Sequence, residues 1–257
     1  SLAWEKNITN GLWTKHYVDD AKNVFVIGYL YSSELVIKKF LPDGTESWTK
    51  VIFGLSSDAL TVSPTGDVYV LCVDPINFGA GYKLLKFSST GNSVWSISLN
   101  YNFFFEELVF GKDGNVYVFL SDDFSTRTIK LNPSNGSILG NSLINLGKPV
   151  FKQGPNNTIF LLGFSPIGRF QVFKIDNSFA ITLFKDTGYN KLDSYNYRAI
   201  EIDTDGSVLV NFIPDFSPSV FLRLSSTGAV LNTKEFAQVT TGVVIDSQGN
   251  YLFPTTN

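Results

Sequence analysis

The amino-acid sequence predicts an all-β protein built from six copies of one structural unit. Three observations support this prediction. A turn followed by an alternating β-branched and aromatic run recurs six times, its copies are 43 to 49 residues apart, and no long stretch keeps the apolar spacing of an amphipathic helix. With 257 residues, of which 44% are hydrophobic and 17% charged, the chain also has enough apolar material for a sizeable core.

Each unit opens with two strands joined by a turn. The copies are VDDAKNVFVIG (18–28), VSPTGDVYVLC (62–72), FGKDGNVYVFL (110–120), QGPNNTIFLLG (153–163), EIDTDGSVLVN (201–211) and VIDSQGNYLFP (244–254). Their turn residues are Lys22, Gly66, Gly114, Asn157, Gly206 and Gly249. Glycine supplies the positive φ that tight turns need, and the Val, Ile, Tyr and Phe residues that follow fit half-buried strands.

A third and a fourth strand complete the unit. In five of the six units the third strand ends in a basic residue and an apolar one: Lys39-Phe40, Lys86-Phe87, Lys130-Leu131, Lys174-Ile175 and Arg223-Leu224. A second turn follows, and the fourth strand carries Trp48 or Trp95 near its start in two units. Four antiparallel strands in about 45 residues make the blade of a β-propeller. We therefore predict a single domain, residues 1–257, folded as a six-bladed β-propeller.

The two ends of the sequence are expected to share the last blade. Trp4 precedes Lys22 by the same spacing that separates Trp48 from Gly66, so residues 1–9 have the position of a final strand. The first two strands of that blade fall at about 239–245 and 250–255. No copy of the third strand follows Tyr251, so the last blade is expected to be three-stranded or to lack a segment. Closure by an N-terminal strand would remove exposed sheet edges.

The repeat resembles a known family. The segments DGNVYV (113–118), LKF (85–87) or IKL (129–131), and TGNSVW (90–95) look like the bacterial β-propeller repeat often called the SBBP repeat. They are also similar to propeller repeats of the pyrroloquinoline-quinone dehydrogenases. The first resemblance implies secreted or surface-attached modules without a shared chemistry. The quinone enzymes have a Cys pair that this chain lacks, so no cofactor is expected.

Composition argues against several function classes. The net charge is −3 and the pI is about 5.2, which disfavours a nucleic-acid partner, and no apolar run is long enough to span a membrane. The lone Cys72 and the lone His16 are read as structural residues, and no metal site is predicted. The segment that begins with Asp203 and Asp205 is similar to the start of a calcium-binding loop but lacks the final glutamate of such a loop. A hairpin turn is therefore favoured there.

Two further groups of charged residues have structural readings. The repeated Lys and Arg residues could form a ring for an anionic ligand, but pairing with turn carboxylates such as Asp43 or Asp176 is favoured. Glu106 and Glu107 are adjacent on a strand, so their side chains should point to opposite faces. This arrangement disfavours a two-carboxylate catalytic site.

The longer connections point to a binding face. Loops between the second and third strands, and links between blades, are rich in aromatic and amide residues that can stack on a sugar or grip a peptide. The candidate ligand-binding residues are Tyr189, Asn190, Asp193, Tyr195, Tyr197 and Arg198 in the longest link, with Tyr101, Asn102, Phe124 and Phe216 elsewhere. Some of these rings are expected to fill gaps between blades instead.

These features predict a non-enzymatic extracellular binding module whose leading ligand is a glycan or a glycosylated surface. The alternatives are a protein-protein interaction or adhesion scaffold and a propeller hydrolase or lyase with carboxylates and tyrosines in its funnel. A start at Ser1 fits removal of a secretory leader, so a secreted or cell-surface protein is expected. The sequons at Asn7, Asn135 and Asn156 are possible glycosylation sites.

Overall fold

The computed structural model describes residues 4–5, 8, 11–30, 34–53, 56–73, 81–101, 103, 105–190, 198–214, 219–237, 240 and 242–254. The described part is all-β, as predicted, and its strands form six antiparallel sheets that we call blades 1 to 6 in chain order. Blades 1 to 5 have four strands each and blade 6 has two among the described residues. None of the described residues lies in a helix of the length and apolarity needed to cross a membrane.

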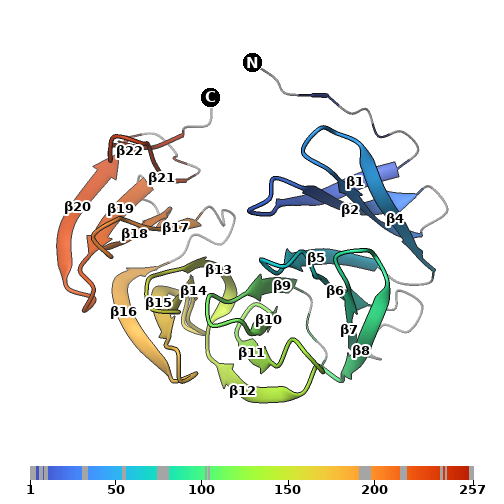
Figure 1. Ribbon diagram of the computed structural model, residues 1–257. Coiled ribbons are helices and arrows are strands. Elements are labelled where there is room, and N and C mark those ends of the chain that lie inside the picture. The colour runs from blue at the N-terminus through green and yellow to red at the C-terminus, as the bar shows by residue number, and fades with distance from the viewer. Residues whose placement is uncertain are drawn as a thin grey trace. The chain divides into compact units, whose positions relative to one another are not determined.

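The strands of each blade follow one another along the chain (Figure 1). Blade 1 contains β1 (Gly11–Val18), β2 (Val24–Leu30), β3 (Leu35–Phe40) and β4 (Glu46–Ile52). Blade 2 contains β5 (Ser56–Val62), β6 (Val68–Val73), β7 (Tyr82–Phe87) and β8 (Ser93–Leu99). Blade 3 contains β9 (Phe105–Phe110), β10 (Val116–Ser121), β11 (Thr126–Leu131) and β12 (Ile138–Ile144).

The remaining blades repeat the pattern. Blade 4 contains β13 (Gly147–Gln153), β14 (Ile159–Phe164), β15 (Arg169–Ile175) and β16 (Ile181–Asn190). Blade 5 contains β17 (Arg198–Ile202), β18 (Val208–Phe212), β19 (Ser219–Leu224) and β20 (Val230–Phe236). Blade 6 contains β21 (Val244–Ile245) and β22 (Tyr251–Leu252), which are shorter than the strands predicted at 239–245 and 250–255.

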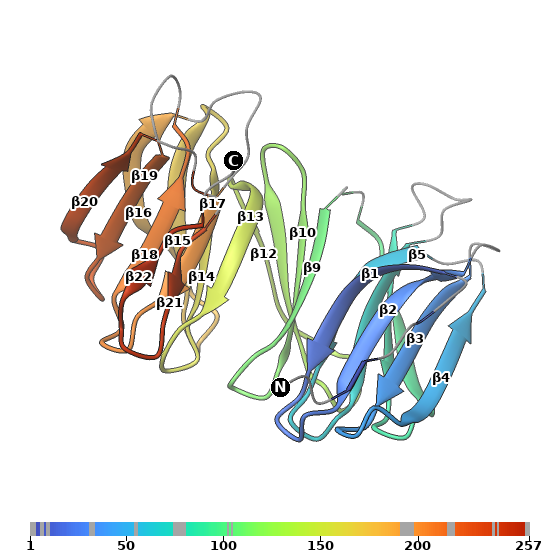
Figure 2. The same cartoon turned by 90° about the horizontal axis from the view of Figure 1, so that it is seen from above.

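The chain divides into two compact units. The first holds residues 1–120 and 127–142, and the second holds residues 121–126 and 143–257. Blades 1 to 3 belong to the first unit, apart from the turn between β10 and β11 and the end of β12. Blades 4 to 6 belong to the second. Within each unit the sheets follow in chain order, as the two views of the ribbon show (Figures 1 and 2).

The predicted turn positions have the backbone conformation that the sequence indicated. Positive φ angles occur at Lys22, Gly66, Gly114, Asn157, Gly206 and Gly249. At Lys22 and Asn157 a side chain tolerates the left-handed region, with φ angles of 66° and 59°. The repeat alignment therefore placed all six turns correctly.

Apolar residues of the middle strands form the cores between blades. One cluster joins blades 1 and 2, another joins blades 2 and 3, and a third joins blades 4 and 5. A smaller one, with Leu209, Phe221 and Val243 as its buried members, joins blades 5 and 6. Second strands such as β10 are buried on both faces, so they read as continuous apolar runs rather than alternating ones.

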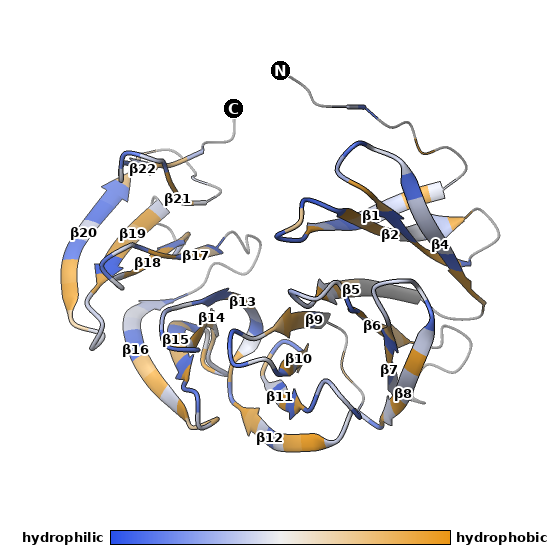
Figure 3. Ribbon diagram, viewed as in Figure 1, coloured by the Kyte–Doolittle hydropathy of each residue, from blue (hydrophilic) through white to orange (hydrophobic). Residues whose placement is uncertain are grey.

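Outer strands keep some apolar side chains in solvent. On β12 the exposed residues are Ile138, Leu139 and Leu143, and the strand is mostly apolar in Figure 3. Because no charged residue lies on β12, this strand has none of the charges that usually protect a sheet edge from pairing.

Candidate functional site

A tryptophan joins consecutive blades at the outer edge of the first unit. The indole Nε1 of Trp48 on β4 donates to the carbonyl of Ser89 in blade 2 at 3.0 Å, and that of Trp95 on β8 donates to Pro133 in blade 3 at 3.1 Å. Both acceptors lie in the turn between the third and fourth strands. A Cβ added to Gly91 of that turn would come 3.0 Å from the Trp48 ring, so glycine also makes room for the indole.

Trp4 makes the same contact with blade 1. Its Nε1 donates to Pro42 at 2.9 Å, its ring lies 6.2 Å from Phe40, and it covers Gly44 as Trp48 covers Gly91. Trp4 therefore has the position toward blade 1 that an outer-strand tryptophan has toward the following blade. This agrees with the spacing that assigned residues 1–9 to a final strand.

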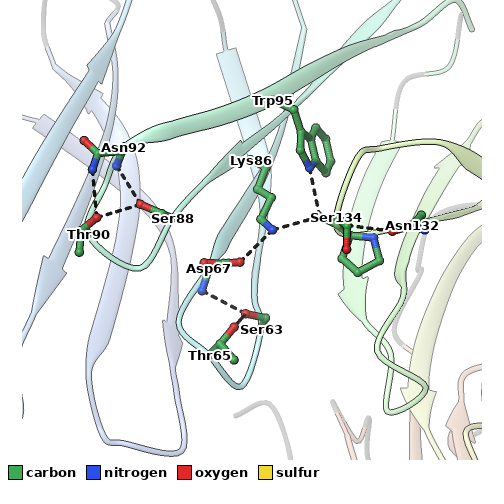
Figure 4. Close-up of polar contacts among 11 residues, drawn as sticks. Ser63, Thr65, Asp67, Lys86, Ser88, Thr90, Asn92, Trp95, Asn132 and Ser134 are labelled. Carbon is green, nitrogen blue, oxygen red and sulfur yellow. Dashed lines mark hydrogen bonds and ion pairs between the residues drawn. The ribbon is translucent and has the colours of Figure 1, made fainter.

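The repeated lysines complete the joint between blades. Lys86 is buried, forms an ion pair with Asp67 at 2.8 Å, and donates to the carbonyl of Pro133 that Trp95 also reaches (Figure 4). Its ammonium lies 5.5 Å from the centre of the Tyr69 ring. Burial alone would lower the pKa of Lys86. The hydrogen bond to Asp67 and the interaction with Tyr69 have the opposite effect and are larger together, so the pKa is raised.

The expected pairing partners of these cations need correction. Lys130 pairs with Asp113 at 2.9 Å, so in blades 2 and 3 the carboxylate belongs to the turn between the first and second strands. Asp43 instead accepts a hydrogen bond within its own turn, from the amide of Thr45. Asp176 also accepts within its own turn, from the hydroxyl and amide of Ser178; these bonds lower its pKa, with a smaller contribution from the charge of the expected partner Lys174. The partner is a first turn because antiparallel pairing brings the end of the third strand beside it.

Blade 5 uses an arginine in this position. Arg223 bonds to Asp205 at 2.6 Å and lies 3.5 Å from Asp203, and the Tyr251 hydroxyl of blade 6 donates to Asp203. The favoured hairpin-turn reading of Asp203 and Asp205 fits these contacts, since both carboxylates are engaged by Arg223. No group of three or more His, Cys, Asp or Glu able to hold a metal occurs among the residues that the structure describes.

The blade 5–6 contact predicts a titration at alkaline pH. Burial, together with the Asp203 carboxylate, raises the pKa of Tyr251 to about 12. Because the folded pKa exceeds the ordinary value of 10.0, the stabilisation is complete below pH 10 and is lost as the pH rises toward 12. In an absorbance titration at 295 nm, Tyr251→Phe should remove one tyrosine from the part of the curve that titrates near pH 12. An unchanged titration curve would contradict the contact.

Two hydrogen-bonded turns present exposed apolar side chains on the second unit. In the turn between β10 and β11, the Asp122 carboxylate accepts the amides of Phe124 and Ser125 at 2.8 and 2.6 Å. In the turn between β14 and β15, the Arg169 amide donates to the Ser165 hydroxyl at 3.1 Å. Phe124 is 62% exposed and Ile167, in the second turn, is 77% exposed.

Both turns lie beside Gly147, at the start of β13. A Cβ added to Gly147 would lie 2.1 Å from the carbonyl oxygen of Asp123, so the first turn packs directly on that strand. Gly147 pairs with Phe164, the residue before the second turn. We call these two turns, with the exposed side chains of Phe124 and Ile167, the turn patch. Lys148, which forms an ion pair with Asp123, lies at its edge.

Of the predicted ligand-binding residues in the longest link, three are described. Tyr189 is half-buried, with its ring 5.5 Å from Phe212, and Asn190 is exposed at the end of β16. The guanidinium of Arg198 lies over the Phe164 ring at 4.7 Å, and burial lowers its pKa to about 10. Asp193, Tyr195 and Tyr197 lie outside the described residues.

The other predicted residues do not form one cluster with these. The Tyr101 hydroxyl accepts from Asn141 at 2.5 Å, and the Arg127 guanidinium lies 5.1 Å from the Tyr101 ring in the first unit. Phe124 belongs to the turn patch. Asn102 and Phe216 lie outside the described residues. Ile167 was not predicted, although its SPIG turn places an apolar residue at a position that turns usually give to a polar one.

His16, Cys72 and Glu107, whose possible chemical roles the sequence disfavoured, lie in three different environments. His16 is exposed on β1 opposite Val26, and Cys72 is completely buried in β6. Glu107 forms an ion pair with Lys15 of β1 at 2.8 Å. The Glu107 carboxylate is thus engaged with a cation from the first strand of blade 1.

Comparison with known proteins identifies the fold. No family model and no curated protein matches the sequence, so neither the SBBP nor the quinoprotein resemblance gains a match. Virginiamycin B lyase from Staphylococcus aureus superposes with a TM-score of 0.63 over 97% of this chain and 79% of the other, at 15% identity. The Dos1 propeller superposes with a TM-score of 0.63 over 95% of this chain and 66% of the other, at 12% sequence identity.

The fold is that of a β-propeller. A streptogramin B lyase structure agrees, with a TM-score of 0.60 over 98% of this chain and 85% of the other at 14% identity. The superpositions establish the propeller architecture. At sequence identities this low they establish no activity. The propeller accounts for the six sheets and their sequential order.

Proposed function

We propose that this propeller is a binding module that docks a protein partner on the turn patch. The observation that carries the proposal is the pair of exposed apolar side chains, Phe124 and Ile167, held on two hydrogen-bonded turns. Because these bonds hold the backbone of each turn, binding requires less ordering of the chain, which favours affinity. Charged groups at the edge, such as Lys148, give the polar rim that protein interfaces have.

The test uses a random phage-displayed peptide library as the probe and the immobilised chain as target. We expect enriched peptides whose affinity falls about tenfold or more on Phe124→Ser and on Ile167→Ser, as at an interface hot spot. Leu183→Ser is the matched control, because Leu183 is 50% exposed on the outer strand β16. Equal losses in all three variants, or none in the first two, would contradict docking on the turn patch.

A glycan ligand remains the second candidate, because an exposed aromatic ring such as Phe124 can also stack on a sugar. A glycan array distinguishes the two. Hits that free sugar competes away, and that Phe124→Ser abolishes, would favour the lectin-like function. In that case Asn190, together with the predicted residues 193–197, becomes the next region to vary. The secreted or cell-surface location that the sequence predicts stays a proposal under both candidates.

We also propose that residues 1–9 close the propeller as the outer strand of blade 6. The support is the equivalence of three joints, in which Trp4, Trp48 and Trp95 donate to Pro42, Ser89 and Pro133. In the second and third joints the tryptophan belongs to a fourth strand. The same geometry at Trp4 calls for a fourth-strand position ahead of blade 1, and in a ring that position belongs to blade 6.

A further inference from the structure

We propose that the outer seam between blades 1 and 2 binds a small aromatic carboxylate. A groove of about 510 Å³ lies there, lined by the fourth strand of blade 1 (β4) and by the third and fourth strands of blade 2 (β7 and β8). This volume is within the range of about 300 to 1,000 Å³ that is usual for small-molecule sites. All the strands that line the groove belong to the first unit, and the groove shares no residue with the turn patch.

Apolar side chains line the groove on both sides. Strand residues alternate between the two faces of a sheet, so Lys83, Leu85 and Phe87 of β7 lie on one face of blade 2. This face is turned toward blade 1, because Leu85 and Phe87 belong to the apolar cluster that joins the two blades. Ile52 of β4 lines the groove from blade 1, as does Phe53, which is 73% exposed. An aromatic ring in the groove would therefore meet apolar surface from both blades.

Two lysines give the groove a positive charge. The ammonium of Lys50 lies 5.5 Å from the centre of the Phe87 ring, and Lys83 is exposed on β7. Neither lysine forms an ion pair with a residue that the structure describes, and within that part of the chain no acidic residue lines the groove. Lys86, the third lysine of the lining, is already paired with Asp67. The uncompensated charges of Lys50 and Lys83 favour an anionic ligand.

The next seam, between blades 2 and 3, holds an aromatic ring in the equivalent place. Arg127 has the position in the third strand of blade 3 that Lys83 has in blade 2, and its guanidinium lies 5.1 Å from the centre of the Tyr101 ring. Asn141 follows its turn glycine by the same spacing as Ser96, and it donates to the Tyr101 hydroxyl at 2.5 Å. The phenol ring of Tyr101 thus contacts the counterparts of Lys83 and Ser96, both of which line the groove.

The corresponding residues of the first seam differ in size and charge. Counted from the tryptophan of the fourth strand, Tyr101 corresponds to Gly54, which has no side chain and lies outside the described residues. In the same count Lys50 corresponds to Ile97. A ligand with a phenyl or phenol ring would supply the group that Tyr101 supplies in the next seam. A carboxylate on that ligand would meet Lys50, a cation that the next seam lacks at this position.

The test measures binding of 4-hydroxyphenylacetate to the 257-residue chain by isothermal titration calorimetry. We expect saturable binding to one site, and binding at least about threefold weaker for 4-hydroxyphenylacetamide, the neutral analogue with the same ring. Lys50→Met and Lys83→Met should each weaken binding of the carboxylate by a similar factor. Lys234→Met is the matched control, because Lys234 lies over the Phe236 ring at 5.1 Å on β20 of the second unit, and it should leave the affinity unchanged.

Three results would overturn the proposal. One is the absence of saturable binding up to millimolar ligand. Another is an affinity for the neutral analogue within about threefold of that for the carboxylate, a comparison that the wild-type chain decides even where a variant fails to fold. The last is an affinity of Lys50→Met and Lys83→Met no lower than that of Lys234→Met, since that would place the ligand outside this groove. None of these outcomes bears on Phe124 or Ile167, so the docking proposal stands or falls separately.

Discussion

Phe212→Ala is expected to destabilise the second unit by about 3 to 5 kcal/mol, the usual cost of removing a fully buried phenylalanine. Phe212 has no exposed surface, stacks on Phe170 with ring centres 4.4 Å apart, and contacts Tyr189. Its ring thus joins blades 4 and 5, and the smaller side chain would leave a cavity that two rigid sheets cannot close. Urea unfolding followed by circular dichroism measures the change.

Leu183→Ala is the control for that experiment, because Leu183 is 50% exposed and should change stability by less than about 0.5 kcal/mol. The four tryptophans, at positions 4, 13, 48 and 95, all belong to the first unit. Their fluorescence therefore reports separately on that unit in the same titration. A midpoint for Phe212→Ala equal to that of the control would contradict the role of Phe212 in the core.

The second large effect is expected at the buried ion pair of blade 3. Asp113→Ala should cost about 3 to 5 kcal/mol, because it leaves the buried ammonium of Lys130 without its carboxylate. The side chains of both residues are 11% exposed, and Asp113 also accepts from the Tyr117 hydroxyl at 2.9 Å. Removing the lysine as well should recover part of the loss. We expect the double variant Asp113→Ala, Lys130→Met to be more stable than Asp113→Ala alone.

The same pair predicts a dependence on pH. Burial raises the pKa of Asp113, but the bonds from Lys130, Asn115 and Tyr117 outweigh it and lower the pKa below 3.8. Stability from this carboxylate is therefore present above about pH 4 and is lost as the pH falls through the lowered value. Acid unfolding of Asp113→Ala should be less steep than that of the wild type. Parallel acid curves, or a double variant no better than the single one, would contradict the ion pair.

The sequence was sufficient for the fold because the repeat carries local information in every copy. Turn residues with positive φ, apolar second strands and the basic residue of the third strand all follow from one alignment, and Lys22 and Gly249 fit it as well as Gly66 does. Partners across blades were harder to predict. Asp67 and Asp113 occupy different places in their turns, so no single position marks the carboxylate that meets the lysine.

The candidate site depended on exposure, which the sequence did not reveal. Tyr189 and Phe124 were equivalent as aromatic loop residues, yet Tyr189 packs on Phe212 and Phe124 lies in solvent. The hydroxyls that hold the links between blades were also missed. They belong to Tyr82, Thr126 and Ser219, three different residue types at the start of third strands. Only the structure shows that they share one role.

Closure of the ring by residues 1–9 is the central claim, and a distance between the chain's two ends tests it most directly. Spin labels on cysteines introduced at Glu5 and Leu252, both exposed, report that distance by pulsed electron paramagnetic resonance, while Cys72 is fully buried and stays unlabelled. Closure would place residues 1–9 and β22 two interstrand spacings of about 4.8 Å apart. Allowing for the length of the two spin labels, we expect one narrow distribution of label-to-label distances within about 25 Å. A broad distribution with no population in that range would contradict closure.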